Sequence, residues 1–427
     1  MSHTIESETI EPATTEAASP LDHRLTPHFP ALARFASTKT LAASPLYREL
    51  RPEIERVLGN VLQEDLTDAG TRAARSLHTA AHAAAHAAAH AGAADALRAT
   101  AWNIERGKQL PGIIRALQSH PILRASDVLL LTELDYGMAR TSNAHVAREI
   151  ARALGMNYAF APCYLALNKG SGVEADAEGE NERALHGNAL FSRHPLRRVH
   201  AVALPNGKDK MAGKEKRLGQ QRAVVADVQH PAGEFRAVSL HLDAHSTQRH
   251  RHQQMRIILD HLASLEPRLP VLVGGDWNTS TYNSRRAAYA ILGYARRVAM
   301  GVGNVVRNHY PYPERWFERG LFRELERRGY RYRELNALGV CTLHYDVGDA
   351  AVNTNMGDWI PQWCFPFINW ALKQHEGRCS LKLDWFAGKE IRLAPHTRPL
   401  VVGELRDAGG ALLSDHDPIV LDFVPES

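Results

Sequence analysis

The distribution of apolar and polar positions changes near residue 97. From there to residue 425, short apolar runs alternate with amphipathic segments. The runs predict strands at 97–103, 127–132, 186–192, 222–229, 235–241, 270–275, 382–387 and 418–423. Apolar spacing of three and four residues predicts helices at 108–118, 143–153, 247–264, 283–291 and 315–328. We therefore expect one α/β or α+β domain over residues 97–425.

The chain before this domain divides into two parts. Residues 1–45 are rich in Pro, Thr, Ser and Ala and have little apolar periodicity, so we expect a mobile, disordered tail. Helical apolar spacing begins after Ser44 and Pro45, and it predicts a helix over 46–64 that packs one face on the rest of the protein. Residues 46–96 together are expected to form a helical extension rich in Ala and His.

The alanine-rich part of this extension carries a histidine repeat. Residues 69–99 hold 16 alanines, and four histidines recur at intervals of four residues, at His78, His82, His86 and His90. Alanine favours a helix, on which these histidines form a slowly winding stripe. Two interpretations stay open: a solvated helix that links the tail to the domain, or a stripe that binds a metal ion or senses pH.

Composition narrows the class of protein. The chain has 427 residues, 44% hydrophobic, and a net charge of +4, too small by itself to indicate a nucleic-acid binder. No stretch reaches the roughly 18 to 20 continuous apolar residues of a membrane-spanning helix, and the acidic first 20 residues do not resemble a secretory signal. We expect a cytoplasmic protein without integral membrane contact. The four cysteines lack a CxxC pair and indicate reduced thiols.

Polar residues that can carry chemistry cluster at the ends of the predicted strands. Five clusters stand out: Trp102–Glu105, Leu131–Asp135, Ser239–Asp243, Gly274–Thr279 and Ser414–Pro418. Each alone is weak evidence, because carboxylates and turn residues commonly end strands. Their joint occurrence in this order is much harder to obtain by accident.

These clusters, in this order, resemble the endonuclease/exonuclease/phosphatase superfamily over residues 97–425. The resemblance extends to the segment HGNALFSRHP at 186–195 and to KLDWF at 382–386. It implies an α/β fold, a four-layered sandwich of two packed β-sheets flanked by helices, and a metal-dependent phosphoric ester hydrolase. Against the compact members, this chain carries an insertion rich in Arg and aromatic residues at about 296–380.

The candidate metal ligands are Asn103, Glu133 and Asp415. Glu133 is a hard oxygen donor suited to Mg²⁺ or Mn²⁺, and Asn103 can complete the shell or orient Glu133 without adding charge. Magnesium keeps most of its waters, so one or two carboxylates are enough, and Asp415 is a further ligand, direct or through water.

The candidate catalytic residues are His241, Asp276, Asn278, Asp384 and His416. The resemblance implies that His416 lies beside the scissile phosphate, with Asp384 fixing its tautomer. Asp276 is the candidate for orienting or deprotonating water, and Asn278 for donating to a phosphoryl oxygen. His241 matches a histidine on the other side of the phosphate. Which group is the general base stays open.

The substrate class also stays open. A phosphodiester, with nucleic acid favoured, follows from His241 and from two segments of net charge +7 (193–222) and +8 (285–333). The alternative is a phospholipid or inositol-phosphate hydrolase that uses the aromatic segment 356–370 in peripheral contact with a membrane. Five carboxylates within 174–182 weaken the duplex-DNA interpretation. A catalytically idle scaffold built on the His/Ala helix is the third hypothesis.

Overall fold

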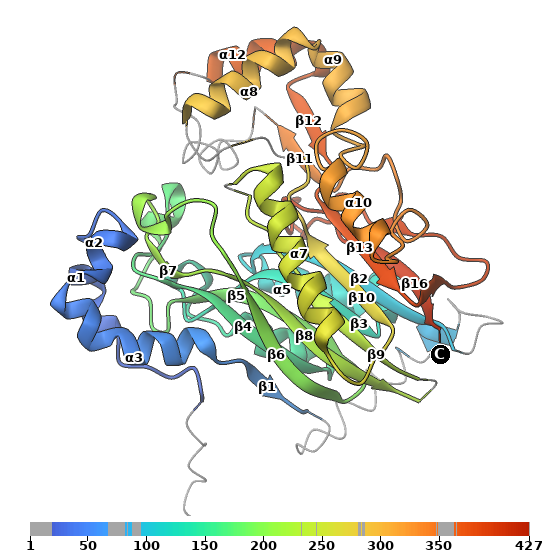
Figure 1. Cartoon of the computed structure of the whole chain (residues 1–427), viewed down its shortest axis with the longest axis horizontal. Coiled ribbons are helices and arrows are strands. Elements are labelled where there is room, and N and C mark those ends of the chain that lie inside the picture. The colour runs from blue at the N-terminus through green and yellow to red at the C-terminus, as the bar shows by residue number, and fades with distance from the viewer. Residues whose placement is uncertain are drawn as a thin grey trace, which may run out of the picture.

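The computed structural model describes residues 19–66, 82, 84–87, 95–231, 233–244, 246–280, 283, 287–346, 348, 363 and 365–426. Two large β-sheets pack against each other and helices flank them (Figure 1). This arrangement confirms the predicted mixed α/β sandwich. No helix among the described residues is both long and apolar enough to cross a membrane.

The first sheet has nine strands and holds both ends of the domain. Its central strands β2 and β3 are parallel, and the remaining pairs are antiparallel. In spatial order its strands are β1 (Leu62–Glu64), β4 (Asn157–Ala166), β5 (Leu185–Ser192), β3 (Val128–Tyr136), β2 (Leu97–Arg106), β16 (Ile419–Pro425) and β14 (Ile391–Leu393), with β7 (Arg217–Gly219) on β4 and β15 (Leu400–Val401) on β16.

The second sheet has five strands, and a separate two-stranded sheet lies in the insertion. The five strands are, in order, β13 (Asp384–Lys389), β10 (Val271–Asp276), β9 (Gly233–Ser239), β8 (Gln221–His230) and β6 (Leu196–Leu204). The small sheet pairs β11 (Leu343–Asp346) with β12 (Arg378–Leu381).

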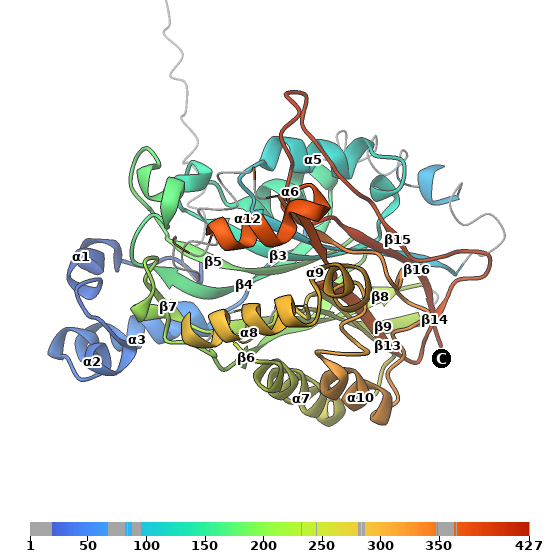
Figure 2. The same ribbon diagram turned by 90° about the horizontal axis from the view of Figure 1, so that it is seen from above.

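Alternation along the strands explains how the layers form. On β2, Leu97, Ala99 and Ala101 point into the core between the sheets, whereas Trp102 and Ile104 join the core on the outer face. That outer face is covered by α5 (Leu110–Ser119) and α6 (Val146–Leu154). The second sheet is covered by α7 (Gln248–Ser264) and α10 (Arg319–Arg327), which lie side by side in both views (Figures 1 and 2).

The N-terminal region differs from the expectation of a mobile tail up to residue 45. Residues 19–44 include α1 (Phe29–Leu32) and α2 (Thr38–Ala42), and they lead into α3 (Pro45–Gly59). Apolar side chains of this region, such as Leu21, Leu25 and Phe29, are buried in the same core as α5 and α6. The expected helix over 46–64 ends at Gly59, and β1 follows it.

The histidine repeat is only partly described. His78 and His90 lie outside the described residues, whereas His82 and His86 contact the two carboxylate oxygens of Asp127, each at 3.2 Å. Both histidines therefore contact the residue that directly precedes β3, at the opposite end of that strand from Glu133.

An arm that includes only part of the insertion projects beyond the two sheets (Figure 1). It contains α8 (Ala287–Ala299), α9 (Val302–Asn304) and α12 (Phe365–Leu372) beside the small sheet. Val305, Tyr310, Tyr345, Leu372 and Cys379 form a small core of its own. Cys163, Cys341 and Cys379 are free thiols, and Cys364 lies outside the described residues.

Candidate active site

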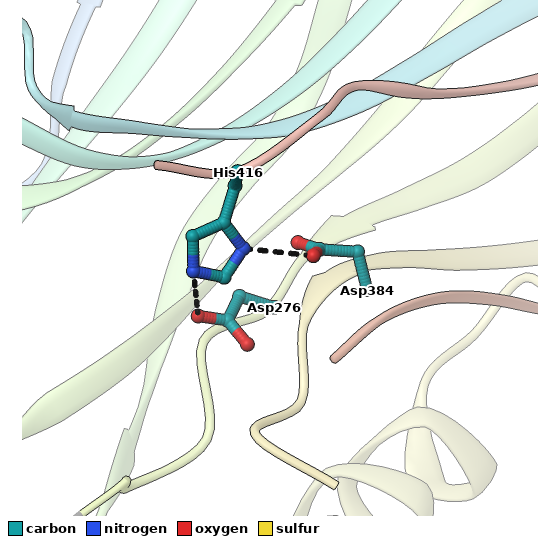
Figure 3. Close-up of side chains that lie close together, drawn as sticks. All are labelled: Asp276, Asp384 and His416. Atoms are coloured by element: carbon teal, nitrogen blue, oxygen red, sulfur yellow. Dashed lines mark hydrogen bonds and ion pairs between the residues drawn. The ribbon is translucent and has the colours of Figure 1, made fainter. Parts of the chain in front are cut away.

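The topology brings the predicted strand ends to one edge of the sandwich. Asn103 lies near the carboxyl end of β2, and Glu133 lies near that of its parallel neighbour β3. In the other sheet, Asp276 ends β10 and is paired in register with Asp384, the first residue of β13. The loop before β16 places His416 between these two strands (Figure 3). The sequence-distant candidates therefore converge because of strand order.

His416 is held between two carboxylates. Its Nδ1 lies 2.8 Å from Asp384 Oδ2, and its Nε2 lies 3.8 Å from Asp276 Oδ2 (Figure 3). Trp102 Nε1 donates to its backbone carbonyl at 2.7 Å, which fixes the loop. Burial alone would lower the pKa of His416, but Asp384 and Asp276 outweigh it and raise this pKa well above its usual range. The two carboxylates therefore favour the imidazolium form of the ring.

Asp276 is the polar centre of the group. Its Oδ2 accepts from Asn103 Nδ2 at 3.1 Å, and its Oδ1 accepts from the backbone N–H of Asn278 at 2.9 Å. Burial raises the pKa of Asp276, and the two nearby histidines oppose that rise. The preceding Gly275 has φ 137°, and a Cβ there would lie 2.1 Å from the Leu240 carbonyl oxygen, so the turn requires glycine.

His241 and Asn278 form the wall beside Asp276. His241 Nε2 lies 3.5 Å from Asp276 Oδ2 and 3.1 Å from Asn278 Nδ2. Asn278 Nδ2 also donates to the Leu242 carbonyl at 3.0 Å, and its backbone has φ 52°. Asparagine tolerates this left-handed conformation, which turns its amide toward His241.

A backbone irregularity turns Glu133 into the site. The pairing of β3 shifts register between Leu131 and Leu134, and Glu133 has φ 58°. Asn103 Nδ2 donates to Glu133 Oε1 at 3.2 Å. Burial would raise the pKa of Glu133, but Arg106, His241 and His186 outweigh it and hold this pKa well below its usual range. Glu133 is thus an anionic oxygen donor at any physiological pH.

The carboxylates around Glu133 fit a divalent cation. Burial and the charge of Asp415 raise the pKa of Glu105 to about 7, and burial and the charge of Glu133 raise the pKa of Asp415. A hard cation would relieve this repulsion, and oxygen donors are the ligands that Mg²⁺ and Mn²⁺ take. Glu105 was not among the sequence candidates, although it stands two residues after Asn103.

A second group of side chains is close enough together to be considered as a metal site. Ligand atoms of Asp276, Asp384 and His416 lie within 4.8 Å of one another. The 2.8 Å contact between His416 Nδ1 and Asp384 Oδ2 is that of a charged hydrogen bond, so of these three residues only His416 Nε2 and the Asp276 carboxylate could face an ion. We therefore place the candidate metal site at Glu133 and its neighbours.

A charged network supports the metal side of the site. Arg140 is buried and contacts Asp135, Glu174 and Glu215 at 2.7, 2.9 and 3.0 Å. Asp135 Oδ1 in turn lies 2.8 Å from His186 Nδ1. Glu174, the first carboxylate of the acidic segment 174–182, is therefore directed inward and partly neutralised, instead of repelling polyanions at the surface.

Most of the candidate catalytic and metal-binding groups open onto one cavity of about 670 Å³. Seven of the eight sequence candidates line it, and Asp384 lies behind His416, fully buried. Sequence reasoning missed further lining residues whose partners are distant in the chain, among them Arg106, Tyr164, His186, Lys208 and Lys210.

The comparison with protein families settles the kind of protein. A model of the Endonuclease/Exonuclease/phosphatase family matches residues 100–336, more than half of the chain. The chain belongs to this family. No curated protein matches it.

Solved structures similar to this family member have low sequence identity to it. An endonuclease/exonuclease/phosphatase from Beutenbergia cavernae is 16% identical (TM-score 0.44), with 78% of this chain and 72% of that chain covered. The human Nocturnin catalytic domain with bound sulfate is 15% identical (TM-score 0.41; 77% and 94% covered). D. rerio TDP2 with a single-strand DNA product is 14% identical (TM-score 0.41; 77% and 98% covered). No conclusion on substrate rests on them.

The arginine segment 315–333 and the aromatic residues of the insertion differ in their position relative to the cavity. Arginines of segment 315–333 pair with nearby carboxylates, as Arg328 does with Asp260 and Arg333 with Glu326, and none of the segment lines the cavity. Of the aromatic residues in the insertion, Trp359 lies outside the described residues, and Trp363 and Phe367 line the cavity.

Proposed function

We propose that this protein is a Mg²⁺- or Mn²⁺-dependent hydrolase of phosphodiesters. The observation that carries the proposal is the juxtaposition of the Asp276–His416–Asp384 group with Glu133 and Asn103 on one cavity. Membership of the family supports phosphoester hydrolysis. A divalent cation held by Glu133, with Asn103, Asp415 and Glu105 beside it, would neutralise charge on the phosphoryl oxygens.

The protein residues then have distinct roles. His416, as an imidazolium oriented by Asp384, donates from Nε2 to a phosphoryl oxygen. Asp276 accepts a proton from water, and its raised pKa makes it a stronger base. As its proton moves to Asp276, water adds to phosphorus and the ester P–O bond breaks. The leaving oxygen takes a proton from solvent water, and Asp276 returns its own proton to solvent. Asn278 and His241 contact the opposite side of the phosphoryl group.

The basic residues of the cavity support a substrate with a phosphate anion. Arg106, Lys208, Lys210 and Arg217 line it together with Lys214. Such a surface suits both nucleic acid, which the sequence favoured, and a phospholipid. A non-catalytic scaffold does not require the buried and mutually oriented carboxylates and histidines.

Hydrolysis of bis-p-nitrophenyl phosphate tests the reaction without choosing the natural substrate. The full chain should hydrolyse this diester with Mg²⁺ or Mn²⁺, and excess EDTA should abolish turnover. His416→Asn should lose activity, whereas His396→Asn, at an exposed histidine with φ 62°, is the matched control. Equal turnover by His416→Asn and the wild type would refute the proposal.

A further inference from the structure

The cavity has two chemically different walls. One side, in the segment between β6 and β8, is charged and has an excess of cations: Lys208, Lys210 and Lys214 line it with Asp209 and Glu215. The other side is formed by the arm, where Ile291 and Val298 from α8 face Ile368 from α12. Tyr294 Oη donates to the Phe367 carbonyl at 2.6 Å and joins the two helices. An anion and an apolar group can therefore be held at once, next to His416.

The apolar wall continues onto the outer surface of the arm. Eight large apolar side chains are exposed in the described part of the chain, and five belong to this arm. Their exposed fractions are 45% for Tyr289, 65% for Leu292, 61% for Trp363, 55% for Phe367 and 68% for Trp370. Phe367 and Trp370 lie three residues apart on α12 and share one face, and the ring of Trp363 packs edge-on against that of Phe367. Because the arm has its own core, these residues are not needed to fold it.

The segments that contain the two long helices of the arm carry cations and no carboxylate, whereas the small sheet beside them carries Asp346, paired with Arg378, and Glu376 precedes its second strand. Neither 287–313 nor 363–375 contains an Asp or Glu, and Arg296, Arg307 and Lys373 are exposed. A helical surface with aromatic and aliphatic side chains and exposed cations, on segments without carboxylates, complements an anionic phospholipid surface.

We propose that the arm of α8 and α12 docks on an anionic phospholipid bilayer and delivers a phospholipid phosphodiester to the catalytic residues. This substrate class rests on the proposed function. The headgroup phosphate meets the basic wall and His416, and the apolar part of the lipid lies along α8 and α12. Leu292, Ile291 and Ile368 favour a lipid over nucleic acid, since aliphatic side chains offer no stacking platform for bases.

Vesicle sedimentation tests the docking without requiring turnover. The full chain is mixed with vesicles of equimolar phosphatidylglycerol and phosphatidylcholine. Leu292→Ser and Trp370→Ala are the test variants, and Val173→Ser and Trp316→Ala, at side chains 61% and 52% exposed outside α8 and α12, are matched controls. We expect each test variant to lose roughly 10-fold to 100-fold in partitioning, the factor for one large apolar group, while both controls sediment like the wild type.

The outcomes separate docking from chemistry. The docking proposal is overturned if the wild type does not sediment with the vesicles. It is also overturned if both test variants sediment as well as the wild type does. Weaker binding of a single-stranded oligonucleotide by Trp370→Ala, with vesicle binding intact, replaces the lipid with nucleic acid. Docking together with release of a headgroup from the same vesicles supports the substrate class. Hydrolysis of bis-p-nitrophenyl phosphate without vesicle binding leaves the proposed function standing and removes only this inference.

Discussion

Replacing Asp384 with Asn isolates the charge that orients His416. The substitution keeps the side-chain shape and one hydrogen-bonding atom near Nδ1, but it removes the negative charge 2.8 Å from the ring. Asp384 is fully buried and lies outside the cavity lining, so it does not touch substrate directly. Its hydrogen bond with His416 is the contact through which we expect a loss of rate to act, and, besides burial, its charge also raises the pKa of Asp276.

The expected loss follows from the geometry. Two unit charges 2.8 Å apart interact by about 6 kcal/mol at an effective dielectric constant of ~20, an upper bound because the amide dipole retains part of it. A positioned acid–base group contributes roughly 10² to 10⁴ in rate. We expect Asp384→Asn to lower kcat by a factor of about 10² to 10⁴, and His416→Ala to lower it similarly.

The assay is a double-mutant cycle on a soluble diester. If the two residues act as a unit, the double variant should be no slower than His416→Ala. Asp260→Asn, at a surface carboxylate 60% exposed that contacts Arg328, is the control and should keep wild-type kcat. Thermal unfolding should show that every variant is folded. Multiplicative losses in the double variant would refute the proposed pair.

Three further predictions follow from other parts of the structure. Glu133→Gln should raise the Mg²⁺ concentration needed for half-maximal activity, because it removes the anionic ligand; an unchanged metal titration would contradict the assignment. His145 Nδ1 accepts the Arg148 N–H at 3.2 Å, and burial lowers the pKa of His145 to about 3. The unfolded chain therefore gains a proton below about pH 6.5 that the folded chain does not, so stability should fall by about 2 kcal/mol between pH 8 and pH 5. The variant His145→Asn keeps a capping side chain but cannot take up this proton. Its free energy of unfolding in urea should therefore fall less than that of the wild type between pH 8 and pH 5, and an identical pH dependence would contradict the prediction. Ile54→Ala, at a side chain 2% exposed, should cost about 2 to 5 kcal/mol of unfolding free energy, and a loss below 1 kcal/mol would show that α3 is not part of the core.

The strands that carry the site could be predicted because their sequence pattern is simple. Those ending at Asn103, Glu133 and Asp276 are apolar runs followed by polar residues. Strand order then brings these ends together, as the resemblance implied. The roles assigned to the eight candidates remain predictions, although the structure places them on one cavity or, for Asp384, directly behind it.

Other parts of the fold could not be predicted from an apolar run followed by polar residues. Strand β4 is buried on both faces and contains Pro162, which normally argues against a central strand; the pairing shifts register there and accommodates it. The order of residues 19–44 depends on contacts such as Lys216 Nζ with the Ala33 carbonyl at 2.6 Å, which no local pattern reveals. His186 was missed for the same reason, because its partner Asp135 lies on another strand.

The buried guanidinium of Arg140 joins segments that are far apart in the sequence. It contacts Asp135 on β3, Glu174 in the acidic segment and Glu215 just before β7. Breaking one of these contacts leaves the others with an unbalanced buried charge, so the segments are released together. Proteolytic nicking after Arg140 replacement should therefore begin at the 174–182 and 208–216 loops at the same time, as one cooperative unit of local unfolding.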